Sequence, residues 1–243
     1  MISPSLESMV GRRIMLLSPH ADDVAYSIGG IVARLSMRAD IRLMTIFGYS
    51  GWALPQALCE KSADAISTER EREDRAYCVR RGIDYELLFC PDSFVMGYDS
   101  ATELSIDATD DPRTEGVVSL ICNAVACWVP QVVFAPCGIG GHVDHQIVRI
   151  AADELHHVEV LYYEDVPYSS SLSLLELERQ LTAQGLTPAL TVDIDVVLES
   201  KYEDMLGYRS QTNASTIAGM LLHASRVGTG LARYAERLWR REN

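Results

Sequence analysis

The chain has 243 residues, of which 48% are hydrophobic and 23% charged, a composition typical of soluble globular proteins. Its formal net charge of −13 argues against nucleic-acid partners and anionic membranes, because phosphate recognition needs clustered Lys and Arg. No apolar run approaches the ~18 residues of a transmembrane helix. The first residues also lack the order of a signal peptide, so we expect a cytoplasmic protein without a membrane span.

Short apolar runs alternate with longer amphipathic ones through the first two thirds of the chain. The pattern predicts strands at residues 13–19, 41–48, 85–91, 131–137 and 158–165. It predicts helices between them at residues 27–38, 63–82, 115–129 and 144–157. Apolar strands that are each followed by a helix indicate a Rossmann-like, doubly wound α/β fold, with a mainly parallel sheet and helices on both faces.

The last third of the chain is less regular. We expect a helix at 172–184, a strand at 189–194 and helices at 196–208 and 213–241. No repeat or low-complexity linker divides the chain, so residues 1–243 are interpreted as one domain with a C-terminal helical segment at 212–243.

Two clusters of ionisable residues follow predicted strands. The first is "SPHADD", with His20, Asp22 and Asp23, and the second is "GGHVDH", with His142 and His145. The carboxyl ends of parallel strands meet at one rim of a doubly wound sheet, where such folds bind their ligands. The two motifs are therefore predicted to lie together although they are far apart in the sequence.

This set of side chains suits a hydrolytic zinc site, which needs three N or O ligands and one open position. His20, Asp23 and His145 supply two imidazoles and one carboxylate. The side chain of Asp22 diverges from that of Asp23, so Asp22 is left free to accept a proton from a water whose pKa the metal lowers. Each residue alone is more often a helix cap or a buried hydrogen-bond partner, so only the two motifs together indicate a metal site.

Other chemistries find less support in the sequence. The glycines Gly138, Gly140 and Gly141 permit close approach of backbone to a ligand, but their order does not match the GxGxxG dinucleotide motif. No GxSxG elbow and no GxxxxGK[ST] loop occurs. The six cysteines form no CxxC pair, so neither a disulfide framework nor a cysteine zinc site is indicated.

The two motifs resemble those of the LmbE-like, or PIG-L, family of zinc-dependent N-acetylglucosamine deacetylases. The family's first motif usually reads His-Pro-Asp-Asp-Glu, whereas Ala21 and Val24 replace Pro and Glu here. The chain is more similar to a branch that begins Ser-Pro-His-x-Asp-Asp. Further matches at 70–76, 162–168 and 201–211 extend the resemblance over about residues 13–211.

The resemblance implies a role for each matching residue. It assigns the metal to His20, Asp23 and His145, and the general base to Asp22. His142 would stabilise the oxyanion, if protonated, or protonate the leaving amine. Asp144 would orient a neighbouring histidine, and Arg70 would shape the substrate pocket, although a solvated charge on a helix is an equal reading of Arg70.

The expected reaction is removal of an N-acetyl group from an amino sugar, or from a glycoside or secondary metabolite that carries one. Two alternatives stay open: an amidase for another N-acyl small molecule, and an inactive metal-binding interaction module. Fe²⁺ suits the same ligands as Zn²⁺. The long segments at 48–67 and 90–116 are candidate walls of the substrate pocket, with Tyr49 and Trp52 as candidate stacking residues. The sequence leaves homo-oligomerisation open.

Overall fold

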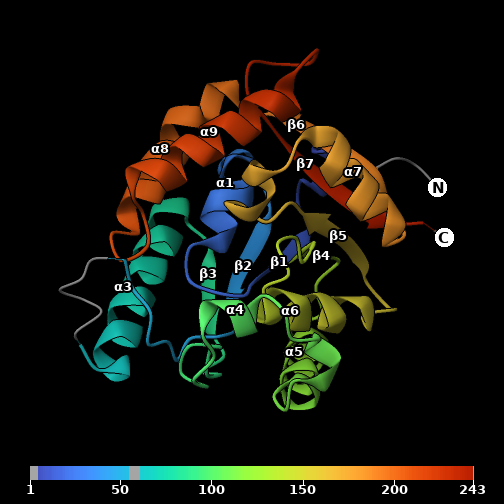
Figure 1. Ribbon diagram of the computed structural model, residues 1–243. Helices are drawn as coiled ribbons and strands as arrows, with labels where there is room; N and C mark the ends of the chain where they lie inside the picture. Colours follow the sequence, from blue (N-terminus) through green and yellow to red (C-terminus); the bar gives the residue numbers. More distant parts are fainter. Residues whose placement is uncertain (1–4, 55–60, 243) are drawn as a thin grey trace.

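Seven strands form one sheet in the computed structural model, which describes residues 5–54 and 61–242. The strand order is β3-β2-β1-β4-β5-β7-β6, and the first five strands of this order are parallel (Figure 1). β7 is antiparallel to both of its neighbours. The strands are β1 (Arg13–Ser18), β2 (Asp40–Thr45), β3 (Asp84–Leu87), β4 (Val132–Pro136), β5 (Glu159–Tyr163), β6 (Leu186–Asp193) and β7 (Ala235–Arg241).

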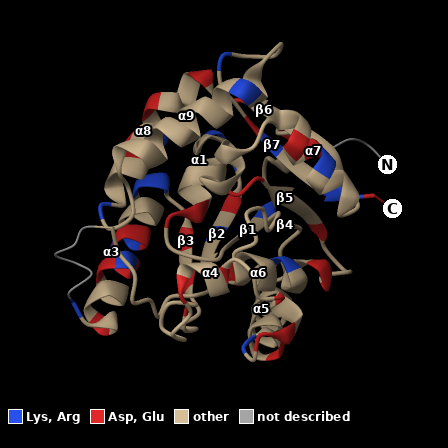
Figure 2. Cartoon of the chain, viewed as in Figure 1, with Lys and Arg blue, Asp and Glu red and all other residues tan. Residues whose placement is uncertain are grey.

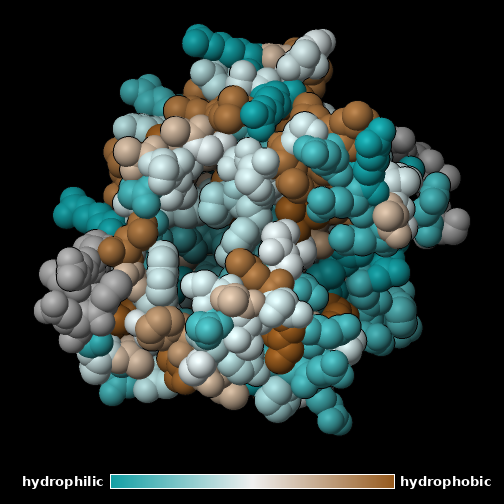
Figure 3. Space-filling model, viewed as in Figure 1, coloured by the Kyte–Doolittle hydropathy of each residue, from teal (hydrophilic) through white to brown (hydrophobic). Residues whose placement is uncertain are grey.

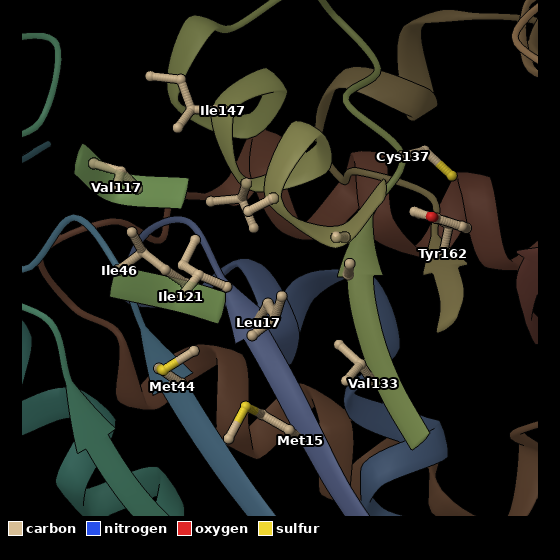
Figure 4. Close-up of a cluster of buried hydrophobic side chains, with 14 of the residues drawn as sticks. Met15, Leu17, Met44, Ile46, Val117, Ile121, Val133, Cys137, Ile147 and Tyr162 are labelled. Carbon is tan, nitrogen blue, oxygen red and sulfur yellow. The ribbon is translucent and has the colours of Figure 1, made fainter. Parts of the chain in front are cut away.

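Helices cover both faces of this sheet. One face packs against α1 (Asp23–Leu35), α3 (Ala63–Arg81) and α9 (Ala214–Gly228), with α8 (Leu198–Gly207) packed beside α1. The other face packs against α5 (Thr114–Trp128), α6 (Val143–Asp153) and α7 (Leu174–Ala183). In β1, Ile14 and Leu16 point into the first core and Met15 and Leu17 into the second (Figure 4). This burial on both sides explains why residues 14–17 of the strand are all apolar.

The predicted doubly wound fold is confirmed, and the predicted elements up to residue 208 have counterparts in the structure. Helix ends follow local chemistry, as in α3, where Gly82 adopts φ 63° and its N–H bonds to the carbonyl of Cys78. The short elements are η1 (Glu7–Met9), α4 (Ser100–Glu103), η2 (Ala108–Asp110), η3 (Tyr168–Ser171) and η4 (Asp195–Val197).

The predicted helix at 213–241, and with it the helical segment at 212–243, is wrong in its second half. α9 ends at Gly228, and β7 then enters the sheet between β5 and β6. The charged residues of β7 obscured the alternation of apolar residues that predicts a strand. Glu236 and Arg237 are nevertheless buried, because they pair with Lys201 and Glu164.

The order of the strands positions the two motifs. β1 lies next to β4, which lies next to β5, and all three run in the same direction. Residues that follow these strands therefore share one rim, at the point where the chain changes its direction of winding. In the described residues, no helix is both long and apolar enough to cross a membrane.

Candidate functional site

The turn after β1 carries the first motif in a constrained conformation. Asp22 adopts φ 107°, which is rare for a residue with a side chain and indicates a strained turn. The turn is closed by local hydrogen bonds, in which Ser18 Oγ donates to the His20 carbonyl at 2.6 Å and His20 N–H donates to Asp23 Oδ2 at 2.8 Å. α1 begins at Asp23, and the group of candidate metal ligands includes Asp23 but not the adjacent Asp22.

The turn after β4 carries the second motif. Gly138, Gly140 and Gly141 all have positive φ, and a Cβ on Gly140 would lie 2.6 Å from the Tyr168 side chain. Only glycine permits this approach. His142 then caps α6, because its Nδ1 accepts a hydrogen bond from the Asp144 N–H at 3.2 Å.

The two turns bring His20, Asp23 and His145 together as predicted, with one donor atom of each within 4.8 Å of the others. His20 Nδ1 lies 3.4 Å from Asp23 Oδ2, and His145 Nε2 lies 3.5 Å from the same oxygen. Tetrahedral zinc with bonds of about 2.0–2.1 Å separates its ligand atoms by about 3.3–3.4 Å. The observed separations therefore fit one small divalent cation.

A carboxylate holds the outer nitrogen of each histidine. Asp144 Oδ2 lies 2.9 Å from His20 Nε2, and Asp165 Oδ1 lies 2.7 Å from His145 Nδ1. These contacts direct the other nitrogen of each ring towards Asp23, which is the arrangement of histidines that bind metals. His20, His142 and Asp144 form a second candidate group, but the Asp144 oxygens are already engaged by the Ser93 N–H, by His20 and by Arg113.

Burial and neighbouring charges strongly shift the pKa values of the residues in this cluster. Burial opposes a charged His20, but Asp144 and Asp23 nevertheless raise its pKa to about 10. Burial also opposes ionised Asp23, yet His145 and His20 lower its pKa to about 2. Without a cation, the site thus holds a proton on His20 between two carboxylates. A metal ion must displace that proton, so metal binding here releases protons.

Asp22 stands apart from this group. Its carboxylate is 9% exposed and, among residues 5–54 and 61–242, takes part in no hydrogen bond or ion pair. Burial and the neighbouring carboxylate of Asp23 raise the pKa of Asp22 well above its usual range. A carboxylate with an elevated pKa and free oxygens is suited to accepting a proton.

His142 presents a neutral ring to the same space. Since its Nδ1 accepts a hydrogen bond, the proton of the neutral ring lies on Nε2. Burial, with the nearby charges of His20 and His145, lowers the pKa of His142 to about 3. The ring can therefore donate a hydrogen bond without first gaining a proton, whereas the prediction from the sequence made oxyanion stabilisation by His142 conditional on a protonated ring.

These side chains line a cavity of about 540 Å³, and this face of the molecule is hollowed near its centre with hydrophilic residues in the hollow (Figure 3). Arg70 lines the cavity, is 5% exposed and donates to Ser50 Oγ at 2.7 Å. Acidic and basic residues occur together along α3 (Figure 2), but Arg70 is buried, so the reading of Arg70 as a solvated charge is wrong.

Both long segments contribute to the cavity. Trp52 lines it, whereas Tyr49 packs against Phe89 with ring centroids 5.2 Å apart. Residues 55–60 of the first segment, including Cys59, lie outside the described residues. The segment 90–116 supplies a larger share of the lining, through Asp92, Ser93, Phe94, Tyr98, Asp99, Ser100 and Glu103.

Sequence reasoning missed three residues that organise the site. Asp165 orients His145 and also accepts from the Ile139 N–H at 3.0 Å. It lies two residues after the end of β5, so the rule that placed the other two motifs would have found it. Arg113 pairs with Asp144 at 2.8 Å, and Ser93 donates its N–H to the same side chain at 3.0 Å. Both come from a loop whose path no sequence pattern predicts.

Comparison with known proteins decides the family. The family model "PIG-L: GlcNAc-PI de-N-acetylase" matches residues 15–156, which include both motifs. The chain belongs to the PIG-L family. A relative, the 2'-N-acetylparomamine deacetylase of Streptomyces fradiae, is 39% identical over 219 residues that cover 88% of this chain and 78% of the relative. The description of the family model and the name of this relative both refer to removal of an N-acetyl group, which agrees with the activity that the two motifs indicated.

Solved structures agree on the fold. A deacetylase from teicoplanin biosynthesis superposes with a TM-score of 0.74 at 21% identity, covering 93% of this chain and 96% of the other. The N,N'-diacetylchitobiose deacetylase of Pyrococcus horikoshii superposes with a TM-score of 0.65 at 20% identity, covering 93% and 82%. At these identities the similarity establishes the PIG-L fold alone.

Proposed function

We propose that this protein is a zinc-dependent hydrolase that removes the N-acetyl group of an amino sugar in a secondary metabolite. The observation that carries the proposal is the buried carboxylate of Asp22, which has no hydrogen bond or ion pair among the described residues, beside a donor set with tetrahedral spacing. His20, Asp23 and His145 would hold the ion, and Fe²⁺ suits the same donors. When bound, the ion supplies Lewis-acid polarisation of a carbonyl and lowers the pKa of water.

The residues of the chain account for the proton transfers of amide hydrolysis. Asp22 takes a proton from the attacking water, whose oxygen forms a bond to the carbonyl carbon. The Nε2–H of His142 donates a hydrogen bond to the carbonyl oxygen as negative charge develops there. Asp22 then returns the proton to the amide nitrogen as the C–N bond breaks. One amide and one water thereby give acetate and an amine.

The substrate class is proposed from the relative and from the cavity. The relative of Streptomyces fradiae is named for 2'-N-acetylparomamine, and we propose an acetylated amino sugar of that kind for this chain. A cavity of about 540 Å³ that includes the rings of Trp52, Phe94 and Tyr98 has the size and the aromatic surface that suit a sugar.

The variant Asp22→Asn tests the proposal. It should keep bound zinc but lose kcat by about 10²–10⁴-fold, since an amide cannot accept the proton. Asp110→Asn, at an exposed aspartate outside the cavity, is the matched control and should retain activity. Acetate release is measured on a panel of N-acetylated amino sugars, with bound metal measured in parallel.

Each alternative has its own outcome in this experiment. To include the first alternative, release of the free amine is also measured on the same amino sugars carrying longer N-acyl groups, and release from these alone would identify an amidase of different specificity. Bound metal without release from any substrate would indicate a binding module. Near-normal turnover of Asp22→Asn would show that Asp22 is not the base.

A further inference from the structure

The short helix α4 places one carboxylate beside the candidate oxyanion donor. Glu103 lies at the end of α4 and lines the cavity, with its side chain 20% exposed. Its Oε2 is 3.7 Å from His142 Nε2, which is too long for a hydrogen bond but close enough for the charge to be felt. The proposed mechanism does not use this residue.

One hydrogen bond to Glu103 and three features of the residues around it fix this position. Ser93 Oγ donates to Glu103 Oε2 at 2.9 Å, and the N–H of the same serine donates to Asp144 at 3.0 Å. Asp99 caps α4 by accepting from the Thr102 N–H at 2.7 Å. A Cβ on Gly141 would lie 3.0 Å from the Leu104 carbonyl, so the glycine permits α4 to approach the turn that carries His142. The carboxylate is therefore built into the wall of the cavity and is not a free surface charge.

Among the described residues, no lysine or arginine neutralises this carboxylate. Within the part of the chain that the structure describes, neither Lys nor Arg forms an ion pair with Glu103. Arg70, which also lines the cavity, is held by Ser50 and by the carbonyl of Trp52. A fixed negative charge near His142 opposes the negative charge that develops on the carbonyl oxygen during attack. The cost disappears if the substrate itself brings a positive charge to Glu103.

We propose that Glu103 determines specificity by binding a free ammonium group of the substrate, so that the preferred substrate is an amino sugar with at least one unacetylated amine close to the acetamido group. This inference rests on the proposed function. A charge-assisted hydrogen bond from ammonium to carboxylate would orient the sugar and remove the unfavourable charge from the reacting centre. Trp52 and Tyr98 then provide ring surface for the sugar and its cation.

The test compares two substrates that differ in one charge. One is a diamino sugar acetylated on a single nitrogen, and the other is the neutral N-acetylglucosamine. The wild type should prefer the charged substrate, and its KM for that substrate should rise with ionic strength. Glu103→Gln should lower kcat/KM for the charged substrate by about 10–100-fold, mostly through KM, and leave the neutral substrate unchanged or faster. Glu115→Gln, at an exposed glutamate outside the cavity, is the matched control.

Two results would overturn the inference. An equal fall of kcat/KM on both substrates would show that Glu103 acts through His142 and not through the substrate. No change on either substrate would show that the carboxylate has no role in recognition. The wild-type preference and its salt dependence need no variant, so the inference stays testable if Glu103→Gln does not fold. Failure of the proposed function differs from both results, since the wild type would then release acetate from neither substrate.

Discussion

The helix α1, which follows Asp22 and begins at Asp23, is interrupted after its first turn. A buried ion pair makes hydrogen bonds to the backbone groups that the interruption leaves free. Ile28 leaves the helical conformation, with φ −133° and ψ 22°. In a regular helix the Gly30 N–H would bond to the Tyr26 carbonyl. Here the Gly30 N–H donates to Glu236 Oε1 at 2.9 Å, and Lys201 Nζ donates to the Tyr26 carbonyl at 2.6 Å. Lys201 and Glu236 complete the repair with a contact of 2.5 Å.

The substitution Glu236→Gln should therefore cost much more stability than its size suggests. The Glu236 carboxylate accepts from Lys201, from the Gly30 N–H and, at 2.7 Å, from the Ile31 N–H. An amide offers one acceptor oxygen, so at least one backbone N–H loses its partner and Lys201 keeps a buried charge without a counter-ion. Breaking a buried pair in this way costs about 3–5 kcal/mol of unfolding free energy.

Urea unfolding at neutral pH measures this cost, with the slope checked against the wild type. The control is Glu69→Gln on the exposed face of α3, where loss of the Arg72 contact should cost about 0.5 kcal/mol or less. The double substitution Lys201→Met with Glu236→Gln should recover part of the loss, because no charge is then left buried. A cost for Glu236→Gln as small as that of Glu69→Gln would refute this account of α1.

Three further predictions concern the buried carboxylates and His142. Asp165→Asn should weaken zinc binding by about 10–100-fold, because one amide oxygen cannot accept from both His145 and the Ile139 N–H. Chelator competition measures the affinity, and an unchanged affinity would contradict the orienting role of Asp165. His142→Ala should lower kcat by about 10²–10³-fold with zinc retained, and a kcat near that of the wild type would exclude it as the oxyanion donor. Burial raises the pKa of Asp74 to about 7, above its unfolded value, so its contribution to stability is present below about pH 4 and is lost as pH rises through about 7. Asp74→Asn should remove that part of the slope of unfolding free energy against pH between about 4 and 7, and parallel curves for variant and wild type would show that Asp74 does not titrate there.

The parts of the fold that were predictable are those in which burial requires a simple pattern of hydrophobic residues. β4 and residues 14–17 of β1 are buried on both faces and are all apolar, and α3 ends at the glycine that its left-handed terminus requires. β7 was not predictable on this basis. Its Glu236 and Arg237 are buried and are stabilised by Lys201 in α8 and by Glu164, which directly follows β5. A pattern of hydrophobic residues cannot predict such ion pairs.

The candidate site divides in the same way. The residues that follow strand ends could be placed from the strand order alone, and the structure brings His20, Asp23 and His145 together as predicted. The neutral state of His142 could not be predicted, because it depends on burial of the ring and on the nearby charges of His20 and His145. The position of Glu103 depends on the path of a long loop between β3 and α5, which Ser93 anchors to Asp144.

The central claim is that two turns, distant in the sequence, hold one metal ion jointly. Zinc titration of the metal-free protein by calorimetry, for the wild type and for His145→Ala, tests it most directly. We predict one zinc per chain in the wild type, with proton release on binding, and an affinity at least 100-fold lower in the variant, since the second turn then supplies no ligand. Equal affinity in the two proteins, or no zinc bound by the wild type at saturating concentration, would contradict the claim.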